Sequence, residues 1–194
     1  MKDFLLEILS DPLTGEALIY DKEKKILHTK RNESVYKIVD EVPLILIENS
    51  IPVSSPLHQN VNTGFNYAHH YQKDSEEYDY FNNNEISATK IEIKRLHETI
   101  IKSVPGNASL IMDVGCGNGW LAGYFLRKNR KVISMDISTI NPAKALQKYP
   151  GENHAALVAD VFHLPAKNNS IDCIVASEIM EHVHDPKLFV QILV

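Results

Sequence analysis

The chain has 194 residues, of which 44% are hydrophobic and 23% are charged, and this is the composition of an ordinary globular protein that can bury a core. Its formal net charge of -5 argues against tight, non-specific binding of nucleic acid. No stretch of about 18 apolar residues and no basic, apolar leader is present, so we expect no membrane span and a cytoplasmic location. Two cysteines do not make a disulfide framework.

The first fifty residues have the pattern of a small α+β unit. A helix is predicted over residues 4–9, and the following Asp11-Pro12-Leu13-Thr14-Gly15 has the composition of a turn. Short strands are predicted at 17–20, 26–29, 35–39 and 42–47. A module this small is marginal in isolation, so we expect it to pack on the rest of the chain or on a partner.

A connecting segment and a long helix come next. Residues 49–63 are rich in Pro, Ser and amide side chains, which is typical of a linker, and residues 65–81 are rich in Tyr and Phe. Tyr71 or Tyr78 could cover a ligand, or the aromatic residues could pack a helix against a sheet, and the sequence leaves both open. A helix is predicted over 86–104, lying against the sheet, because its apolar residues recur at near-helical spacing.

The most informative stretch is 111–119, which reads Ile-Met-Asp-Val-Gly-Cys-Gly-Asn-Gly and precedes a predicted helix at 120–129. A strand that enters a helix through a glycine turn lets the backbone approach a nucleoside-type ligand. The dinucleotide fingerprint requires a small residue where this chain has Trp120, and no Gly-Lys-Ser or Gly-Lys-Thr of a phosphate-binding loop follows. The pattern Asp113-x-Gly115-x-Gly117-x-Gly119 resembles the first motif of class I S-adenosylmethionine (SAM) methyltransferases.

Three further strands follow in the order of right-handed βαβ units. The strand at 131–135 ends at Asp136, about twenty residues past the loop, where an acid can accept hydrogen bonds from ribose hydroxyls. The strand at 155–159 ends at Asp160, and the strand at 173–176 ends at Ser177. The predicted fold is α/β, with a Rossmann-like, doubly wound, mostly parallel sheet whose first four strands are present, preceded by the small α+β unit.

Residues 109–190 thus resemble class I SAM methyltransferases, and most nearly the small-molecule branch that includes quinone-biosynthesis enzymes. The resemblance implies SAM as the cofactor and methyl transfer to an oxygen or carbon of a small-molecule acceptor. It places Asp160 beside the adenine amino group. The implied cofactor-binding residues are Asp113, Gly115, Gly117, Asn118, Gly119, Asp136, Ile137, Asp160, Val161 and Ser177.

Candidate catalytic residues follow the fourth strand. The spacing of Glu178, Glu181 and His182 predicts that they share one face of a helical turn. We interpret Glu181 and His182 as the pair that orients or deprotonates the acceptor. Some related enzymes hold a divalent ion in a similar arrangement, but a further ligand is missing here, so we predict no metal and leave the alternative open.

Residues 1–48 resemble the zinc-ribbon-like domain of methyltransferase activator subunits, through Leu5-Leu6-x-Ile8-Leu9 and the apolar run that ends at 47. Asp11 and Thr14 stand where that family has its first cysteine pair, and Thr29 and Asn32 stand near the second. Without thiolates no tetrahedral zinc site forms, so we expect this ribbon to be held by apolar residues alone.

We therefore expect three segments: a ribbon-like domain at 1–48, a linker and aromatic cap at 49–84, and a SAM-binding domain at 85–194. The resembled family has seven strands, and the chain ends within a predicted helix at 187–194, which suggests C-terminal truncation. We expect either a fragment of a longer enzyme or a protein whose fourth strand is covered by a second copy or a partner chain. The alternatives are a non-catalytic SAM-binding or scaffolding module and an RNA methyltransferase. The sequence does not identify the methyl acceptor.

Overall fold

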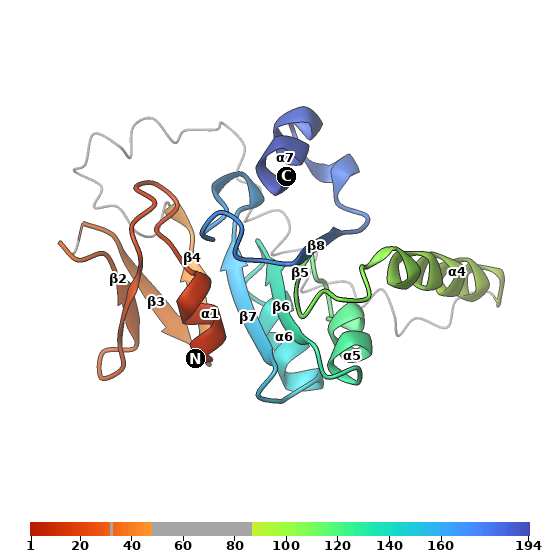
Figure 1. Ribbon diagram of the computed structural model, residues 1–194, viewed down its shortest axis with the longest axis horizontal. Helices are drawn as coiled ribbons and strands as arrows, with labels where there is room; N and C mark the ends of the chain where they lie inside the picture. Colours follow the sequence, from red (N-terminus) through yellow and green to blue (C-terminus); the bar gives the residue numbers. More distant parts are fainter. Residues whose placement is uncertain (32, 48–86) are drawn as a thin grey trace.

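The computed structural model describes residues 1–31, 33–47 and 87–194, with the side chains of the first long helix described from residue 95 onward (Figure 1). The predictions for the linker and aromatic cap, including Tyr71 and Tyr78, and for Asn32 lie outside these residues. The described elements lie close to their predicted bounds. They are α1 (Asp3–Ile8), β1 (Ile19–Asp21), β2 (Ile26–His28), β3 (Val35–Val39), β4 (Val42–Ile45), α4 (Ser87–Ser103), β5 (Leu110–Val114), α5 (Trp120–Leu126), β6 (Lys131–Asp136), α6 (Asn141–Lys148), β7 (His154–Ala159), η2 (Val161–His163), β8 (Cys173–Ala176), η3 (Met180–His182) and α7 (Pro186–Leu193).

One mixed sheet of eight strands runs through the molecule in the order β1-β2-β3-β4-β7-β6-β5-β8. Strands β5 to β8 are parallel and follow the order of a doubly wound fold, which confirms the predicted α/β class. The chain crosses from β7 over to β8, on the other side of β5, so the carboxyl ends of β5 and β8 flank a topological switch point. Such switch points are where ligands of open α/β sheets bind.

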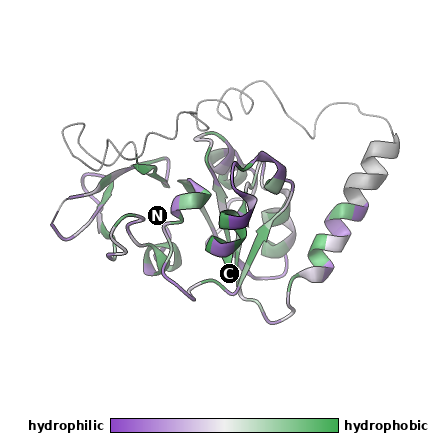
Figure 2. Ribbon diagram, turned by 90° about the horizontal axis from the view of Figure 1, so that it is seen from above, coloured by the Kyte–Doolittle hydropathy of each residue, from purple (hydrophilic) through white to green (hydrophobic). Residues whose placement is uncertain are grey.

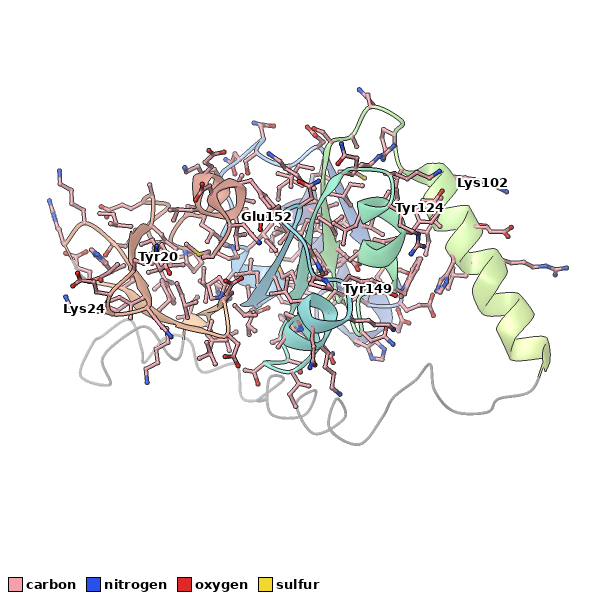
Figure 3. All side chains as sticks on the ribbon, turned by 90° about the horizontal axis from the view of Figure 1, so that it is seen from below. Tyr20, Lys24, Lys102, Tyr124, Tyr149 and Glu152 are labelled. Carbon is pink, nitrogen blue, oxygen red and sulfur yellow. The ribbon has the colours of Figure 1, made fainter. Side chains whose placement is uncertain are left out.

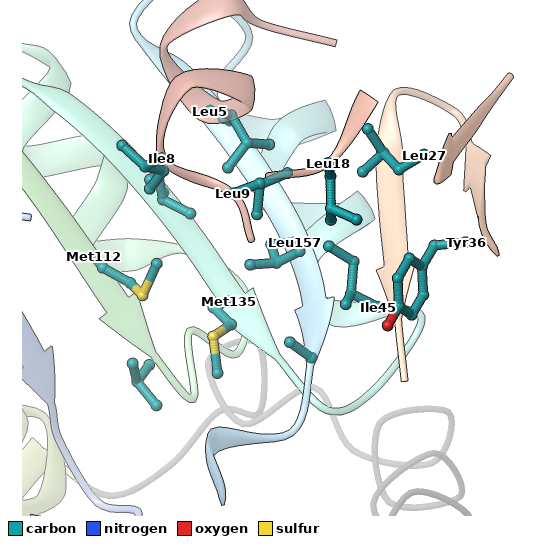
Figure 4. Close-up of a cluster of buried hydrophobic side chains, with 14 of the residues drawn as sticks. Leu5, Ile8, Leu9, Leu18, Leu27, Tyr36, Ile45, Met112, Met135 and Leu157 are labelled. Carbon is teal, nitrogen blue, oxygen red and sulfur yellow. The ribbon is translucent and has the colours of Figure 1, made fainter. Parts of the chain in front are cut away.

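The small N-terminal unit joins this sheet edge to edge. Strand β4 pairs in parallel with β7, with Leu44 opposite Val158 and Ile45 opposite Ala159. Helix α1 buries Leu5 and Ile8 in the same apolar cluster as residues of β5, β6 and β7 (Figure 4). The unit therefore packs on the rest of the chain, which is one of the two alternatives that its small size allowed.

The two faces of the parallel strands are covered by different helices. Helices α5 and α6 cover one face, where Leu121 and Phe125 pack on Ile111 and Val132. Helices α1 and α7 cover the other, and Phe189 of α7 is 2% exposed. Figure 2 shows the apolar strands lying between these layers. Within the described chain β8 has β5 as its one strand neighbour, and coverage of its outer edge by a partner chain or a second copy stays a prediction.

Among the residues of helix α4 whose side chains are described, those near its C-terminal end pack on the body of the protein. Ile100 and Ile101 of its last turns, and Val104 just after it, pack on the α5 side of the core, whereas Leu96 is 38% exposed. The helix runs away from the sheet beyond that point (Figures 1 and 3). The expectation that this helix lies against the sheet thus holds for its C-terminal end. Among the described residues no helix is both long enough and apolar enough to cross a membrane.

The expectation that apolar residues alone hold the ribbon-like unit is wrong. Asp11 is 1% exposed, and its Oδ1 accepts hydrogen bonds from the amides of Leu13 and Thr14 and from the Thr14 hydroxyl. Its Oδ2 accepts a 2.7 Å hydrogen bond from the hydroxyl of buried Tyr36. Thr29 Oγ1 likewise accepts from the amides of residues 33 and 34. The side-chain oxygens of Asp11 and Thr29 thus hold the two turns by hydrogen bonds, at positions where the resembled family has cysteines.

The third glycine of the 115–119 loop is required by packing between helices. Gly119 has a φ of 76°, and a Cβ at this position would lie 2.6 Å from the Cβ of Ala145 in α6. Gly123, one turn into α5, leaves room for the ring of Tyr149, which follows α6 (Figure 3). Helices α5 and α6 therefore approach each other through glycines on the α5 side.

Gly119→Ala is expected to lower the free energy of unfolding by about 3 kcal/mol, because it adds a left-handed penalty to an overpacked contact. Urea unfolding monitored by circular dichroism measures this loss. Gly151→Ala is the matched control, since a Cβ there meets nothing within 4 Å. Equal unfolding midpoints for the two variants would contradict the packing argument.

Candidate functional site

The predicted site residues gather at the carboxyl edge of the parallel strands, around the switch point. Asp113 lies near the end of β5, and the 115–119 loop follows it. Asp136 is the last residue of β6, Asp160 directly follows β7, and Ser177 directly follows β8. Ile137 and Val161 come one residue after the two acids. Sequence spacing thus identified residues that come from four different strands and meet at one edge of the sheet.

The glycine loop is anchored to β6 and open at its centre. The amides of Gly115 and Cys116 both donate to the carbonyl of Met135, at 2.9 and 3.0 Å. Gly117 has a φ of 50°, and a Cβ built there meets nothing within 4 Å. The main chain at Gly117 therefore faces open space, where a ligand can approach it closely.

The Asp136 carboxylate ties this loop to the start of α6. Its Oδ2 accepts hydrogen bonds from the Gly117 amide at 3.2 Å and from Asn141 Nδ2 at 3.1 Å, and its Oδ1 accepts from the Ser138 amide at 2.9 Å. Burial raises the pKa of Asp136, and these hydrogen bonds oppose that effect because they favour the charged form. The sequence did not predict that residues 138 and 141 bind the Asp136 carboxylate. A serine or asparagine a few residues after an acid is too common to indicate such a contact.

Two buried acceptor atoms at the site have no donor. Among the described residues nothing donates to Asp113 Oδ2 or to Asn118 Oδ1. Asp113 is 4% exposed, and burial, together with the negative charge of Asp136, raises its pKa to about 7. Buried polar atoms are almost always hydrogen-bonded, so the two orphan oxygens indicate a donor or cation that binds there.

Asp160 is held in place by the turn that follows it. Its Oδ1 accepts the amide hydrogen of Phe162 at 3.0 Å and so caps the short helix η2. Its Oδ2 lies 3.2 Å from His163 Nδ1. Val161 between them is 7% exposed. The carboxylate is fixed at the end of β7, next to β6, which carries Asp136.

The segment after β8 differs from its predicted form. Glu178 has a φ of 55°, so it cannot continue a helix, and only Met180–His182 form a turn of 3₁₀-helix. The expectation that Glu178, Glu181 and His182 share one helical face is therefore wrong. Glu181 Oε1 and His182 Nε2 lie 4.0 Å apart, and both side chains are about half exposed. In the described chain no three His, Cys, Asp or Glu side chains gather as metal ligands do.

The left-handed turn at Glu178 directs the next residue onto the glycine loop. Ile179 Cδ1 lies 3.0 Å from the position that a Cβ on Gly115 would take. A side chain at residue 115 would therefore be strained by the φ of 72° and would press on the Ile179 side chain. Gly115 lets the segment after β8 pack on the glycine loop, and Gly117 leaves the loop backbone open to a ligand.

Comparison with known proteins agrees with this geometry. Residues 112–193 match a family model described as a methyltransferase domain. Residues 112–193 are therefore similar to methyltransferase domains, including those of curated SAM-dependent enzymes. The acids and glycines described above lie within the matched residues, and one relative, of Mycobacterium tuberculosis and 28% identical over 81 residues, is named a probable S-adenosylmethionine-dependent methyltransferase.

Curated relatives of the methyltransferase domain share about a third of its residues. A malonyl-[acyl-carrier protein] O-methyltransferase of Hamiltonella defensa is 31% identical over 80 residues, which are 41% of this chain and 30% of that protein. A tabtoxin biosynthesis enzyme of Pseudomonas amygdali pv. tabaci is 30% identical over 89 residues, which are 45% of this chain and 34% of that protein. The chain thus spans about a third of the length of these relatives.

Solved structures with a similar fold give weaker likenesses. The SAM-dependent methyltransferase of Mesorhizobium loti has a TM-score of 0.42 and 24% identity, covering 45% of this chain and 41% of that one. A complex of the Haloferax volcanii Trm112 methyltransferase activator with a putative methyltransferase has a TM-score of 0.46 and 21% identity, covering 54% of this chain and 49% of that one. Likenesses of this size indicate neither the substrate nor a partner.

Proposed function

We propose that the protein binds SAM at the carboxyl edge of β5 to β8 and transfers its methyl group to an oxygen or carbon of a small-molecule acceptor. The observation that carries this proposal is the pair of buried, donor-free oxygens on Asp113 and Asn118 beside the open main chain of Gly117. The ammonium group at the amino-acid end of SAM supplies the donor and the positive charge that these oxygens lack. The residues present therefore fit the cofactor.

The other site residues would contact the ribose and the adenine of the cofactor. Asp136 accepts hydrogen bonds from the ribose hydroxyls, and Asp160 faces the adenine amino group. Ile137 and Val161 directly follow these acids, and Ser177 directly follows β8. The fixed hydrogen bonds of both carboxylates mean that little ordering is needed when the ligand binds.

SAM supplies a methyl group on a sulfonium, so the protein has to align the acceptor and, for an oxygen acceptor, remove a proton. We assign this role to Glu181 and His182, which stand side by side after β8. Imidazole and carboxylate groups are the side chains that most often act as general bases. One relative is named as an O-methyltransferase, which supports an oxygen acceptor.

Calorimetric titration with SAM and with S-adenosylhomocysteine, followed by a screen for transfer of a labelled methyl group to small molecules of a cell extract, tests the proposal. We expect both ligands to bind and the label to appear in a small molecule. The double variant Glu181→Gln, His182→Ala should bind SAM as the wild type does and transfer little label. No binding of either ligand would overturn the proposal, binding without transfer would favour a scaffolding module, and label in RNA would favour an RNA methyltransferase.

A further inference from the structure

We propose that Asn141 is a positioning residue whose side-chain amide holds the Asp136 carboxylate in the orientation that receives the ribose hydroxyls of the cofactor. The inference rests on the proposed function and adds to it a residue that lies outside the glycine loop and the strand ends. Asn141 is the first residue of α6, five positions after Asp136.

The geometry at Asp136 separates Asn141 from the other donors. The remaining hydrogen bonds to this carboxylate come from the main-chain amides of Gly117, Ile137 and Ser138. Main-chain amides are set by the fold itself, whereas Asn141 Nδ2 reaches Oδ2 from a side chain at 3.1 Å. Oδ2 also receives the Gly117 amide, so Asn141 fixes the same oxygen that holds the centre of the glycine loop.

The turn that carries Asn141 is rigid. Ser138 Oγ accepts the amide hydrogen of Ile140 at 3.2 Å, and buried Pro142 fixes the backbone at the start of α6. The side-chain amide therefore starts close to the position in which it donates and loses little entropy when it does so. A carboxylate held from several sides keeps few rotamers, so a ligand meets its two oxygens in one orientation.

The need for such a donor follows from the surroundings of Asp136. The carboxylate is partly buried, and the pKa of nearby Asp113 is raised in part by its charge. Loss of one hydrogen bond would favour either a rotated or a protonated Asp136. Both forms would present fewer acceptors to a ribose diol.

If Asn141 served only to start helix α6, its loss would change ligand binding in a different way. Loss of a structural residue lowers stability and weakens all ligands alike. Loss of a positioning residue instead removes the preference for a ribose that carries its 2'-hydroxyl. The affinity ratio of two ligands that differ only in this group therefore separates the two roles.

Isothermal titration of the full chain with S-adenosylhomocysteine and with its 2'-deoxy analogue tests the proposal. The wild type should prefer the ribose ligand by about tenfold, which is the effect of one hydrogen bond to a charged group. Asn141→Ala should bind S-adenosylhomocysteine about tenfold more weakly and discriminate less than threefold, because the Asp136 carboxylate is no longer held. Asn153→Ala is the matched control, since Asn153 Nδ2 donates a hydrogen bond of the same 3.1 Å to Asn129 Oδ1 at the amino end of β7.

Asn141→Ser serves as a second variant, because serine is favoured at the start of helices while its hydroxyl is too short to replace the amide. Thermal melts establish that the variants are folded. Full discrimination between the two ligands in either folded variant would overturn the inference, as would a loss of stability with an unchanged affinity ratio. A wild-type protein that binds neither ligand would instead show that the proposed function has failed.

Discussion

Asp113→Asn is expected to make the ligand-free protein more stable at neutral pH and to remove most of its affinity for SAM. The side chain is 4% exposed, and its Oδ2 has no donor among the described residues. Its pKa is about 7 in the fold, against 3.8 as the ordinary value. Between these two values the folded state therefore holds a proton that the unfolded state has released.

The sign of the pH dependence follows from this difference. Because the folded protein binds more protons, its stability falls as the pH rises from about 4 to about 7 and then stays level. The shift corresponds to about 4 kcal/mol of lost stability above pH 7, since one pKa unit is about 1.4 kcal/mol. Asparagine has the same shape and carries no charge, so it removes this loss. Sites that bind ligands often cost stability in this way.

Urea unfolding of the wild type and of Asp113→Asn at about pH 5 and at about pH 8 checks the prediction. The variant should be more stable at both values, with the larger gain at the higher pH. Asp172→Asn is a control of opposite sign, because the hydroxyl of Ser109 and the amides of residues 109 and 110 lower the pKa of that exposed carboxylate. A destabilised Asp113→Asn at pH 8, or one that binds SAM normally, would contradict the role assigned to Asp113.

The elements that the sequence predicted well are those governed by local pattern. The strand before the glycine loop, the loop itself and the acids after β6 and β7 each follow from spacing along a short segment. Strand β3 matches its predicted bounds, since alternation over five residues fixes one face. Such patterns need no knowledge of what lies across the sheet.

The features that the sequence could not predict depend on partners distant along the chain. The pairing of β4 with β7 joins residues more than a hundred positions apart, and the sequence of Val42–Ile45 does not indicate which strand it pairs with. The left-handed backbone at Glu178 interrupts the helix that the spacing of Glu178, Glu181 and His182 had predicted. Gly123 did carry a signal, because a glycine inside a helical pattern indicates a close approach, and here the approaching group is the Tyr149 ring.

The ribbon-like unit is stabilised by contacts that its sequence did not predict. The missing cysteines led to the expectation that apolar residues alone hold the unit, whereas the structure shows buried polar contacts as well. Asp11 and Thr29 accept hydrogen bonds from the turns around them, and Tyr36 extends this network into the apolar core that the unit shares with the parallel strands (Figure 4). Buried networks of this kind are stabilising only while every donor keeps its acceptor.

Asp11→Ala is therefore expected to lower the free energy of unfolding by about 3 kcal/mol, because it removes the buried carboxylate that accepts hydrogen bonds from the Tyr36 hydroxyl and from the amides of the turn. Burial alone would raise the pKa of Asp11, but hydrogen bonds from Tyr36, Ser34 and Thr14 outweigh burial and lower it. A lowered pKa means that the contribution of Asp11 is complete above its unfolded value of about 3.8 and is lost as the pH falls through the folded value.

The wild-type protein should thus lose stability below about pH 4 more steeply than the variant, and acid unfolding curves of the two proteins measure the difference. Asp21→Ala is the matched control, because the Asp21 carboxylate also accepts a turn amide, that of Lys24, but at an exposed hairpin where the loss is much smaller. A chelator should leave the melting temperature of the wild type unchanged, since the network uses oxygen acceptors in place of thiolates. If the chelator unfolds the protein, or if Asp11→Ala and Asp21→Ala have the same effect, the hydrogen bonds of Asp11 do not replace a metal in this unit.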